Sequence, residues 1–214
     1  MSIRHNISKT SHIIWHNGYM TRADRNNLNN HKSGLVWFTG LPASGKSTIA
    51  HHLEKELFDR GIRSYVLDGD NIRHGLNSNL GFGREDRKEN LRRIAEISKL
   101  MVDAGIVVLA AFISPYREDR EYVRSIAGNE EFFEVYVKCT PEVCENRDTK
   151  GHYKKARAGI IKNYTGISDP YEEPQTPDLI IDTEKYDIET SIKIVLDLLD
   201  KRNFLILRNI EARF

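Results

Sequence analysis

The chain has 214 residues, of which 39% are hydrophobic and 29% are charged. This length corresponds to one ordinary domain with a sizeable core, and the composition excludes both a membrane-embedded and a disordered chain. The formal net charge is +1, so no overall basic excess indicates nucleic-acid binding. A small anionic ligand remains compatible with this charge, because a neutral chain can contain a local basic cluster.

The cysteine content and the N-terminus predict a cytoplasmic location. The two cysteines, Cys139 and Cys144, exclude a disulfide framework, indicate a reducing compartment and form no zinc set with nearby histidines. No apolar run reaches the length of a membrane span, and the N-terminus lacks a secretory signal. Residues 1–20 contain basic residues and no acid, which only faintly favours a transit peptide.

Short apolar runs alternate with helical stretches along most of the chain. This pattern predicts an α/β three-layer fold over residues 34–202, with a mostly parallel sheet and helices on both faces. Residues 1–33 show little periodicity and are expected to form an irregular arm. Strands are expected at 35–38, 62–67, 106–112, 132–137 and 179–181, and helices at 49–60, 86–104, 118–127, from 141 onward and at 188–199.

Two segments depart from this alternation. Residues 147–177 are basic at first and then rich in Pro, Asp and Glu. A long charged insertion in a compact domain is typical of a lid or binding loop, with a disordered excursion as the alternative. The apolar tail at 203–214 is expected to pack back on the domain or to meet a partner.

The run from Gly40 to Ser47 fits the phosphate-loop pattern G-x-x-x-x-G-K-[ST], between a predicted strand and a predicted helix. Its backbone N–H groups and the helix N-terminus would surround phosphate oxygens. Lys46 is expected to reach the β- and γ-phosphates with an exposed side chain, and the Ser47 hydroxyl to hold Mg²⁺. The motif alone does not distinguish a kinase from a switch GTPase or a motor ATPase. The residues predicted to bind the triphosphate are Gly40, Leu41, Pro42, Ala43, Ser44, Gly45, Lys46, Ser47 and Thr48.

Polar residues follow the predicted strands where ligands of open α/β sheets bind. Asp68 and Asp70 suit a proton acceptor or a Mg²⁺ ligand beside a phosphate, although the same run would form a solvated Asx turn. Ser114 could touch a transferred phosphoryl group or merely cap the next helix. Phe82, between two glycines, could stack on a base or make a core contact.

The predicted helix at 86–104 carries polar residues on its inward face. Arg87 and Asn90 fall on the same side as its apolar stripe. A charged side chain there is costly unless it meets a partner, which could be an anionic ligand. Helix capping or a salt bridge to Glu85 is the alternative.

Five motifs, taken in order, closely resemble the adenylyl-sulfate kinase family of P-loop kinases. The similarity extends from about Trp15 to about Lys201. It implies transfer of the γ-phosphoryl group of MgATP to the 3′-hydroxyl of adenosine 5′-phosphosulfate (APS), which gives 3′-phosphoadenosine 5′-phosphosulfate. The resemblance also implies that the enzyme is a homodimer. No binding to nucleic acid or to a membrane is expected. The motifs are the phosphate loop with the preceding 37–40, then 68–73, then 86–94, then 112–117 and finally 147–159.

The resemblance also implies roles for individual residues. Lys46, Asp68 and Ser114 would be catalytic: Asp68 as base or Mg²⁺ organiser, and Ser114 as the serine described in the family as a phosphoserine intermediate. A direct in-line transfer needs no such intermediate. Phe82 and Tyr164 would sandwich the adenine of APS. The other implied substrate-binding residues are Asp70, Asn71, Ile72, Arg73, Arg87, Asn90, Ile113, Lys150 and Asn163.

Some residues depart from the family pattern. Pro42-Ala43 stands where the family often has Ser-Gly, Ile160 replaces a common Glu in the lid, and Tyr164 replaces a common Phe. The alternative functions are another small-molecule or nucleotide kinase, a nucleotide-sensing switch, and an inactive paralogue. Intact Lys46 and Asp68 disfavour the last of these.

Overall fold

The computed structural model describes residues 13–14 and 16–204, so Trp15 and the tail from 205 onward lie outside the described residues. Its central sheet has five strands in the order β2-β3-β1-β4-β5, and every neighbouring pair is parallel. This topology confirms the expected fold class. The strands are β1 (Gly34–Thr39), β2 (Ser64–Asp68), β3 (Val107–Ala111), β4 (Phe132–Lys138) and β5 (Leu179–Asp182).

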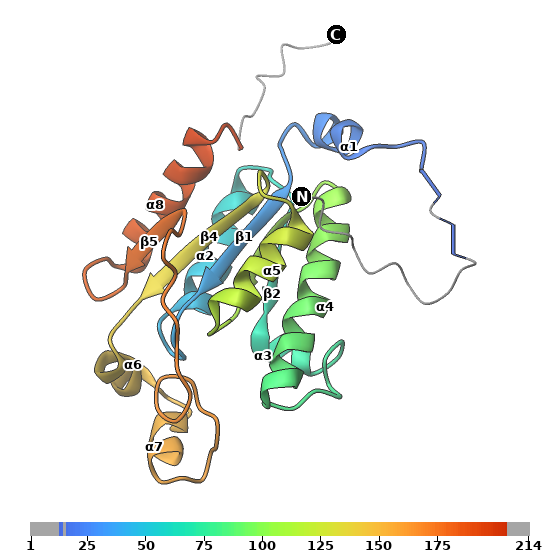
Figure 1. The fold of residues 1–214 in the computed structure, drawn as a ribbon. Coiled ribbons are helices and arrows are strands. Elements are labelled where there is room, and N and C mark those ends of the chain that lie inside the picture. Colours follow the sequence, from blue (N-terminus) through green and yellow to red (C-terminus); the bar gives the residue numbers. More distant parts are fainter. Residues whose placement is uncertain (1–12, 15, 205–214) are drawn as a thin grey trace.

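Helices cover both faces of the sheet, and short helices lie beyond both ends of its strands (Figure 1). Helices α2 (Lys46–Asp59) and α8 (Ile188–Lys201) cover one face, while α4 (Arg84–Asp103) and α5 (Arg117–Ala127) cover the other. The strands run toward the end where α3, α6 and α7 lie, at the bottom of Figure 1. The short helices are α1 (Arg22–Asn29), α3 (Gly69–Arg73), α6 (Pro141–Arg147) and α7 (His152–Arg157).

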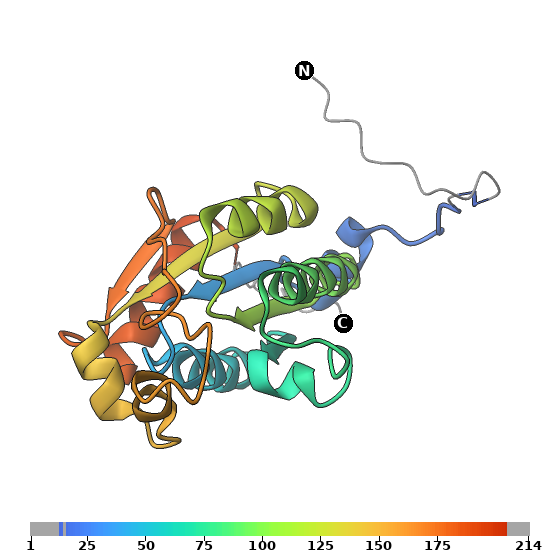
Figure 2. The same cartoon turned by 60° about the horizontal axis from the view of Figure 1, so that its bottom comes forward.

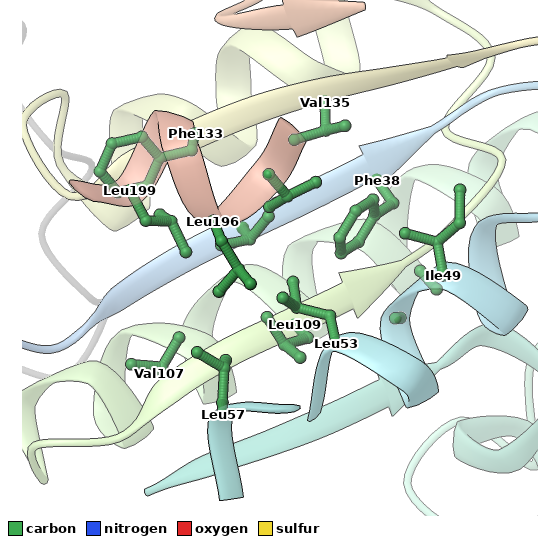
Figure 3. Packing of buried hydrophobic residues seen from close by; sticks show 14 of the residues in the cluster. Phe38, Ile49, Leu53, Leu57, Val107, Leu109, Phe133, Val135, Leu196 and Leu199 are labelled. Atoms are coloured by element: carbon green, nitrogen blue, oxygen red, sulfur yellow. The ribbon is translucent and has the colours of Figure 1, made fainter. Parts of the chain in front are cut away.

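The core consists of two apolar layers separated by the sheet. Val36 and Phe38 of β1 pack in the layer under α2 and α8, which Figure 3 shows, whereas Leu35 and Trp37 pack under α4. All six residues of β1 are buried. A central parallel strand is covered on both faces, so its sequence is apolar without alternation. This core fixes the strand ends on which the candidate site is built.

The expectation of an irregular N-terminal arm is wrong for the residues of α1. Thr21 and Asp24 form a capping box that starts this helix, and α1 has no buried residues. Without a buried face, it shows no apolar periodicity in the sequence. Arg25 ties the helix to the domain by donating to the Asp103 carbonyl at 3.2 Å, and Asn29 donates to the Gly105 carbonyl at 2.9 Å. Figure 2 shows residues 16–21, directly before α1, extending away from the domain.

Two core-forming helices begin earlier than their apolar residues predict. Helix α2 starts at Lys46, directly after Gly45, and α4 starts at Arg84. Their first residues are polar, so a prediction from apolar periodicity begins late, by three residues in α2 and by two in α4. At the other end of the domain, Phe204 is buried and its ring contacts Phe133, with centroids 5.0 Å apart. Within the described residues, no helix has the length and apolarity that crossing a bilayer requires.

Candidate active site

The phosphate loop connects β1 to α2 at the carboxyl edge of the sheet. Gly40 has φ 154°, and a Cβ atom there would lie 2.4 Å from the Val137 carbonyl oxygen. Gly45 has φ 105° and stands at the N-cap of α2. Only glycine fits the first position sterically and the second conformationally. The two fixed glycines of the motif are therefore required by the shape of the loop itself.

The Lys46 side chain is buried, which corrects the expectation that it is exposed. Its Nζ donates to the carbonyl oxygens of Gly40 at 3.0 Å and Leu41 at 2.6 Å, and lies 3.4 Å from the Ser44 hydroxyl. Burial lowers the pKa of Lys46 to about 8. The lysine thus folds back into the loop and holds the loop's own carbonyls.

Ser47 and Asp68 join the phosphate loop to the end of β2. The Ser47 hydroxyl donates to Asp68 Oδ2 at 2.6 Å. The other oxygen, Oδ1, caps α3 by accepting from the backbone N–H groups of Asp70 at 2.9 Å and Asn71 at 3.3 Å. These bonds fix the orientation of both oxygens of a nearly buried carboxylate. A carboxylate that positions a metal ion or accepts a proton needs such a fixed orientation.

Arg73 and Arg87 lie close together without a carboxylate partner. Arg73 donates to the carbonyls of Leu80 at 2.9 Å and Gly81 at 3.0 Å, and Arg87 donates to that of Phe82 at 2.8 Å. Burial lowers the pKa of both guanidinium groups, and the charge of Arg87 lowers that of Arg73 further. Within the described part of the chain, neither forms a salt bridge, although more distant carboxylates favour the charged form of both. Two partly buried cations held by neutral carbonyls are an arrangement that can bind an anion.

Arg87 also connects α4 to the predicted lid. Its guanidinium donates to the Asn163 carbonyl at 2.6 Å and to the Thr165 hydroxyl at 3.1 Å. These partners replace the predicted alternatives of a helix cap or a bond to Glu85. Asn163 itself is exposed, with φ 55°.

The two aromatic residues expected to sandwich adenine do not stack on each other. The Phe82 side chain is 63% exposed and lies against the Arg73 guanidinium, 4.4 Å from its ring centroid. Tyr164 packs edge-on against Tyr153 of α7, with centroids 5.1 Å apart. Arg87 is hydrogen-bonded to the backbone of Phe82 and to that of Asn163, so it brings the two aromatic segments to the same region.

Two contacts tie the segment at 147–177 to the sheet edge. Lys150 forms an ion pair with Asp70, and both side chains are largely exposed. Tyr153 is buried, and its hydroxyl donates to the Pro42 carbonyl of the phosphate loop at 3.0 Å. The segment therefore lies over the phosphate loop and α3 instead of extending into solvent.

Ser114 is buried in a hydrogen-bond network below the sheet edge. Its hydroxyl accepts from Trp37 Nε1 at 3.0 Å and lies 3.0 Å from the Thr39 hydroxyl. Its φ of 39° is a left-handed conformation that a non-glycine residue rarely adopts, and such strain concentrates at functional sites. Thr39 also donates to the Ile113 carbonyl at 2.8 Å, so the predicted residues Ile113 and Ser114 belong to one network.

The remaining predicted site residues surround α3 and α4. Ile72 is half-buried against the core, Asn71 is exposed, and Asn90 is buried. Two residues that contact the phosphate loop, directly or through one partner, were not predicted as site residues. The Thr183 hydroxyl donates to the Ser44 carbonyl at 3.1 Å, and Arg147 donates to the Thr183 hydroxyl at 2.9 Å. Thr183 directly follows β5, so the strand-end rule would have found it.

Ala43 of the phosphate loop adopts φ 60°, where an alanine is strained. We expect Ala43→Gly to leave the free energy of unfolding unchanged or raise it by up to about 1 kcal/mol, because relief of strain offsets the added freedom of the unfolded chain. Ala50→Gly, inside α2, is the matched control and should lower it by about 1 kcal/mol or more. Urea unfolding measures both, and equal losses would contradict the assignment of strain to Ala43.

Comparison with known proteins places this site in context. A family model described as adenylylsulphate kinase matches residues 32–182. The adenylyl-sulfate kinase of Oceanobacillus iheyensis is 55% identical over 199 residues, which cover 93% of this chain and 100% of that protein. Among solved structures, the APS kinase CysC of Mycobacterium tuberculosis in complex with AMPPNP and APS matches with a TM-score of 0.77 and 46% identity, covering 79% of this chain and 99% of that chain.

A third match differs in assembly and length. The hexameric APS kinase from Thiobacillus denitrificans has a TM-score of 0.62 and 29% identity. The match covers 86% of this chain but 32% of that protein, so this chain corresponds to one part of a longer relative.

Proposed function

Because this chain belongs to the adenylyl-sulfate kinase family, we propose that it binds ATP in the phosphate loop and APS against α3, α4 and the lid. The chain is a phosphotransferase that moves the γ-phosphoryl group of ATP to the 3′-hydroxyl of APS. The residue roles that follow are our proposal for how this site performs that reaction.

The observation that carries the proposal is the pair Arg73 and Arg87, two neighbouring cations that form no salt bridge with the described residues. Helix α3 begins at Gly69, directly after its N-cap Asp68, which is hydrogen-bonded to the loop, and it ends at Arg73. Its five residues span about 7 Å along the helix axis. A second anionic ligand held by the arginines would thus lie close enough to the loop for direct transfer.

Ser47 and Asp68 supply the oxygen ligands that Mg²⁺ prefers. We propose that Ser47 binds the ion directly and that Asp68 orients Ser47 and the ion's water ligands. When bound with ATP, Mg²⁺ neutralises charge on the β- and γ-phosphates. No group of three or more His, Cys, Asp or Glu side chains suited to a metal occurs among the described residues.

Transfer is proposed to be direct, without phosphorylation of Ser114. The Ser114 hydroxyl is buried and engaged with Trp37 and Thr39, so attack by this hydroxyl on ATP would require breaking that network. We propose that Ser114 instead shapes the floor of the site. Asp68 remains a candidate to accept the proton of the attacking 3′-hydroxyl, since its carboxylate already accepts a hydrogen bond from the Ser47 hydroxyl.

The lid is proposed to close over both nucleotides. On closure, Lys150 would leave its ion pair with Asp70 and bind the substrate, and Tyr164 would turn toward the adenine that Phe82 holds. Closure would exclude water, which competes for the phosphoryl group.

We further propose a homodimer in the cytoplasm. Sedimentation of the purified chain tests the dimer, and a monomer at micromolar concentration would contradict it.

The test of the activity is the product formed from MgATP and APS, identified by its mass. We expect 3′-phosphoadenosine 5′-phosphosulfate and ADP in equal amounts. AMP and nucleosides are the control acceptors for the alternative of another small-molecule kinase. Turnover of AMP without turnover of APS would overturn the proposal.

Arg87→Ala is expected to raise the KM for APS by about 100-fold, because a charged hydrogen-bond donor to the anion is lost from a partly buried site. The KM for ATP should change little. Arg92→Ala, on the same helix but paired with Glu89, is the control and should leave both constants unchanged. Initial-rate kinetics with each substrate varied measure the effect, and an unchanged KM for APS would refute the role of Arg87.

A further inference from the structure

Asn77 is a fully buried polar residue in the loop between α3 and α4, and the proposed mechanism does not use it. Its Nδ2 donates to Asn90 Oδ1 at 2.8 Å, while its own Oδ1 has no partner among the described residues. A buried oxygen without a hydrogen bond destabilises the fold. An apolar side chain of similar size would not carry this cost. The contact with Asn90 is the favourable interaction that this side chain makes.

This contact fixes the orientation of the Asn90 carboxamide. A carboxamide has one acceptor end and one donor end, and the two point apart. Because Asn90 Oδ1 accepts from Asn77, the donor end Nδ2 is directed away from Asn77. Arg87 lies one turn earlier on the same face of α4. The side chains of Asn90 and Arg87, both of which carry N–H donors, therefore project from one side of the helix.

We propose that Asn77 is a positioning residue that holds Asn90 as a hydrogen-bond donor to the oxygens of APS. This inference rests on the proposed function, in which Asn90 contacts APS. Arg73, Arg87 and Asn90 then present only donors to the ligand. Such a site favours a group that offers only acceptor oxygens, as a phosphosulfate does.

The loop that carries Asn77 has other anchors. Arg73 donates to the carbonyls of Leu80 and Gly81, and Arg93 donates to the Leu76 carbonyl at 3.1 Å and to Asn79 Oδ1 at 2.8 Å. The backbone N–H of Asn77 also donates to the Ile72 carbonyl at 3.0 Å. A change confined to the Asn77 side chain therefore leaves these anchors in place.

The test is Asn77→Asp in a double-mutant cycle with Asn90→Ala. An ionised aspartate has the same shape but cannot donate, so Asn90 would turn its Nδ2 toward it and present Oδ1 to the substrate. We expect the KM for APS to rise about tenfold, the worth of one hydrogen bond, with the KM for ATP within about twofold of its original value. In the Asn90→Ala background, the same substitution should add nothing.

Two further variants keep the test decisive. Asn77→Ala cannot donate in any protonation state and should also raise the KM for APS, even if the aspartate variant fails to fold. Asn79→Asp makes the same chemical change in the same loop, retains the acceptor for Arg93, and should leave the KM for APS unchanged.

The outcomes separate the inference from the function on which it rests. If Asn90→Ala raises the KM for APS and the effect of Asn77→Asp is undiminished in that background, Asn77 does not act through Asn90 and the inference fails alone. If Asn90→Ala leaves the KM for APS unchanged, the proposed contact between Asn90 and APS is wrong. Equal rises in the KM values for ATP and APS would indicate a general structural defect and overturn the positioning role.

Discussion

Lys46→Met is expected to lower kcat/KM for ATP by about 1,000-fold or more, because the variant loses a charged donor to the transferred phosphoryl group. Methionine retains an apolar stem of similar length, which suits a buried position in contact with Leu41. The variant should therefore fold. Lys55→Met, on the exposed face of α2, is the matched control and should keep full activity.

The pKa of Lys46 adds a second, independent readout. Burial lowers this pKa to about 8 in the free protein, and bound phosphates would raise it again. Lys46 is charged below that value, so ATP affinity should be fully present below about pH 8 and fall as the pH rises above it. Binding at about pH 8.5 should then take up protons, which calorimetry in buffers of different ionisation enthalpy measures. Proton uptake that persists in Lys46→Met would assign it to another group.

The reason for the burial of Lys46 could not be taken from the motif. The pattern fixes the lysine at the start of a helix, but it does not say what the ammonium group contacts without a nucleotide. In the structure the group bonds to the carbonyls of Gly40 and Leu41, which belong to the same loop. The motif indicates where the loop needs glycine, but it does not specify that the loop's carbonyl oxygens converge on the ammonium group and bury it.

Sequence patterning predicted the sheet, because buried strands and amphipathic helices follow apolar periodicity. It failed for α1, whose start depends on a capping box and whose residues are not buried. The site residues at strand ends, such as Asp68 and Ser114, were identified by the strand-end rule and by the family resemblance. The inward turn of Ser114 depends on contacts with Trp37 and Thr39, which are 77 and 75 residues away in the chain.

The bridging role of Arg87 shows the same limit. Helical periodicity correctly placed Arg87 near the inward face of α4, but its partners are Asn163 and Thr165 on the lid. These contacts join α4 to the segment predicted as a lid, more than 70 residues away, and the local pattern of neither segment specifies the other. Long-range polar contacts therefore had to come from the folded structure.

Asp68→Asn is expected to reduce kcat by about 100-fold or more, with smaller changes in the KM values for ATP and APS. The substitution keeps the shape of the side chain and an oxygen that can still cap α3. It removes the negative charge that accepts the hydrogen bond from Ser47 and would orient Mg²⁺. A loss confined to the transition state lowers kcat, whereas loss of ground-state binding raises KM.

A second capping aspartate provides the control for this prediction. Asp187 is the N-cap of α8, where its side chain accepts from the Thr190 N–H at 2.8 Å. Asp187→Asn makes the same change at a helix start away from the phosphate loop and should leave kcat unchanged. Because both variants alter a cap in the same way, urea unfolding should show similar small losses of stability, about 1 kcal/mol or less. If Asp68→Asn raised only the KM values at an unchanged kcat, Asp68 would be a binding residue, and the proton acceptor and Mg²⁺ organiser would have to be sought elsewhere along this edge of the sheet.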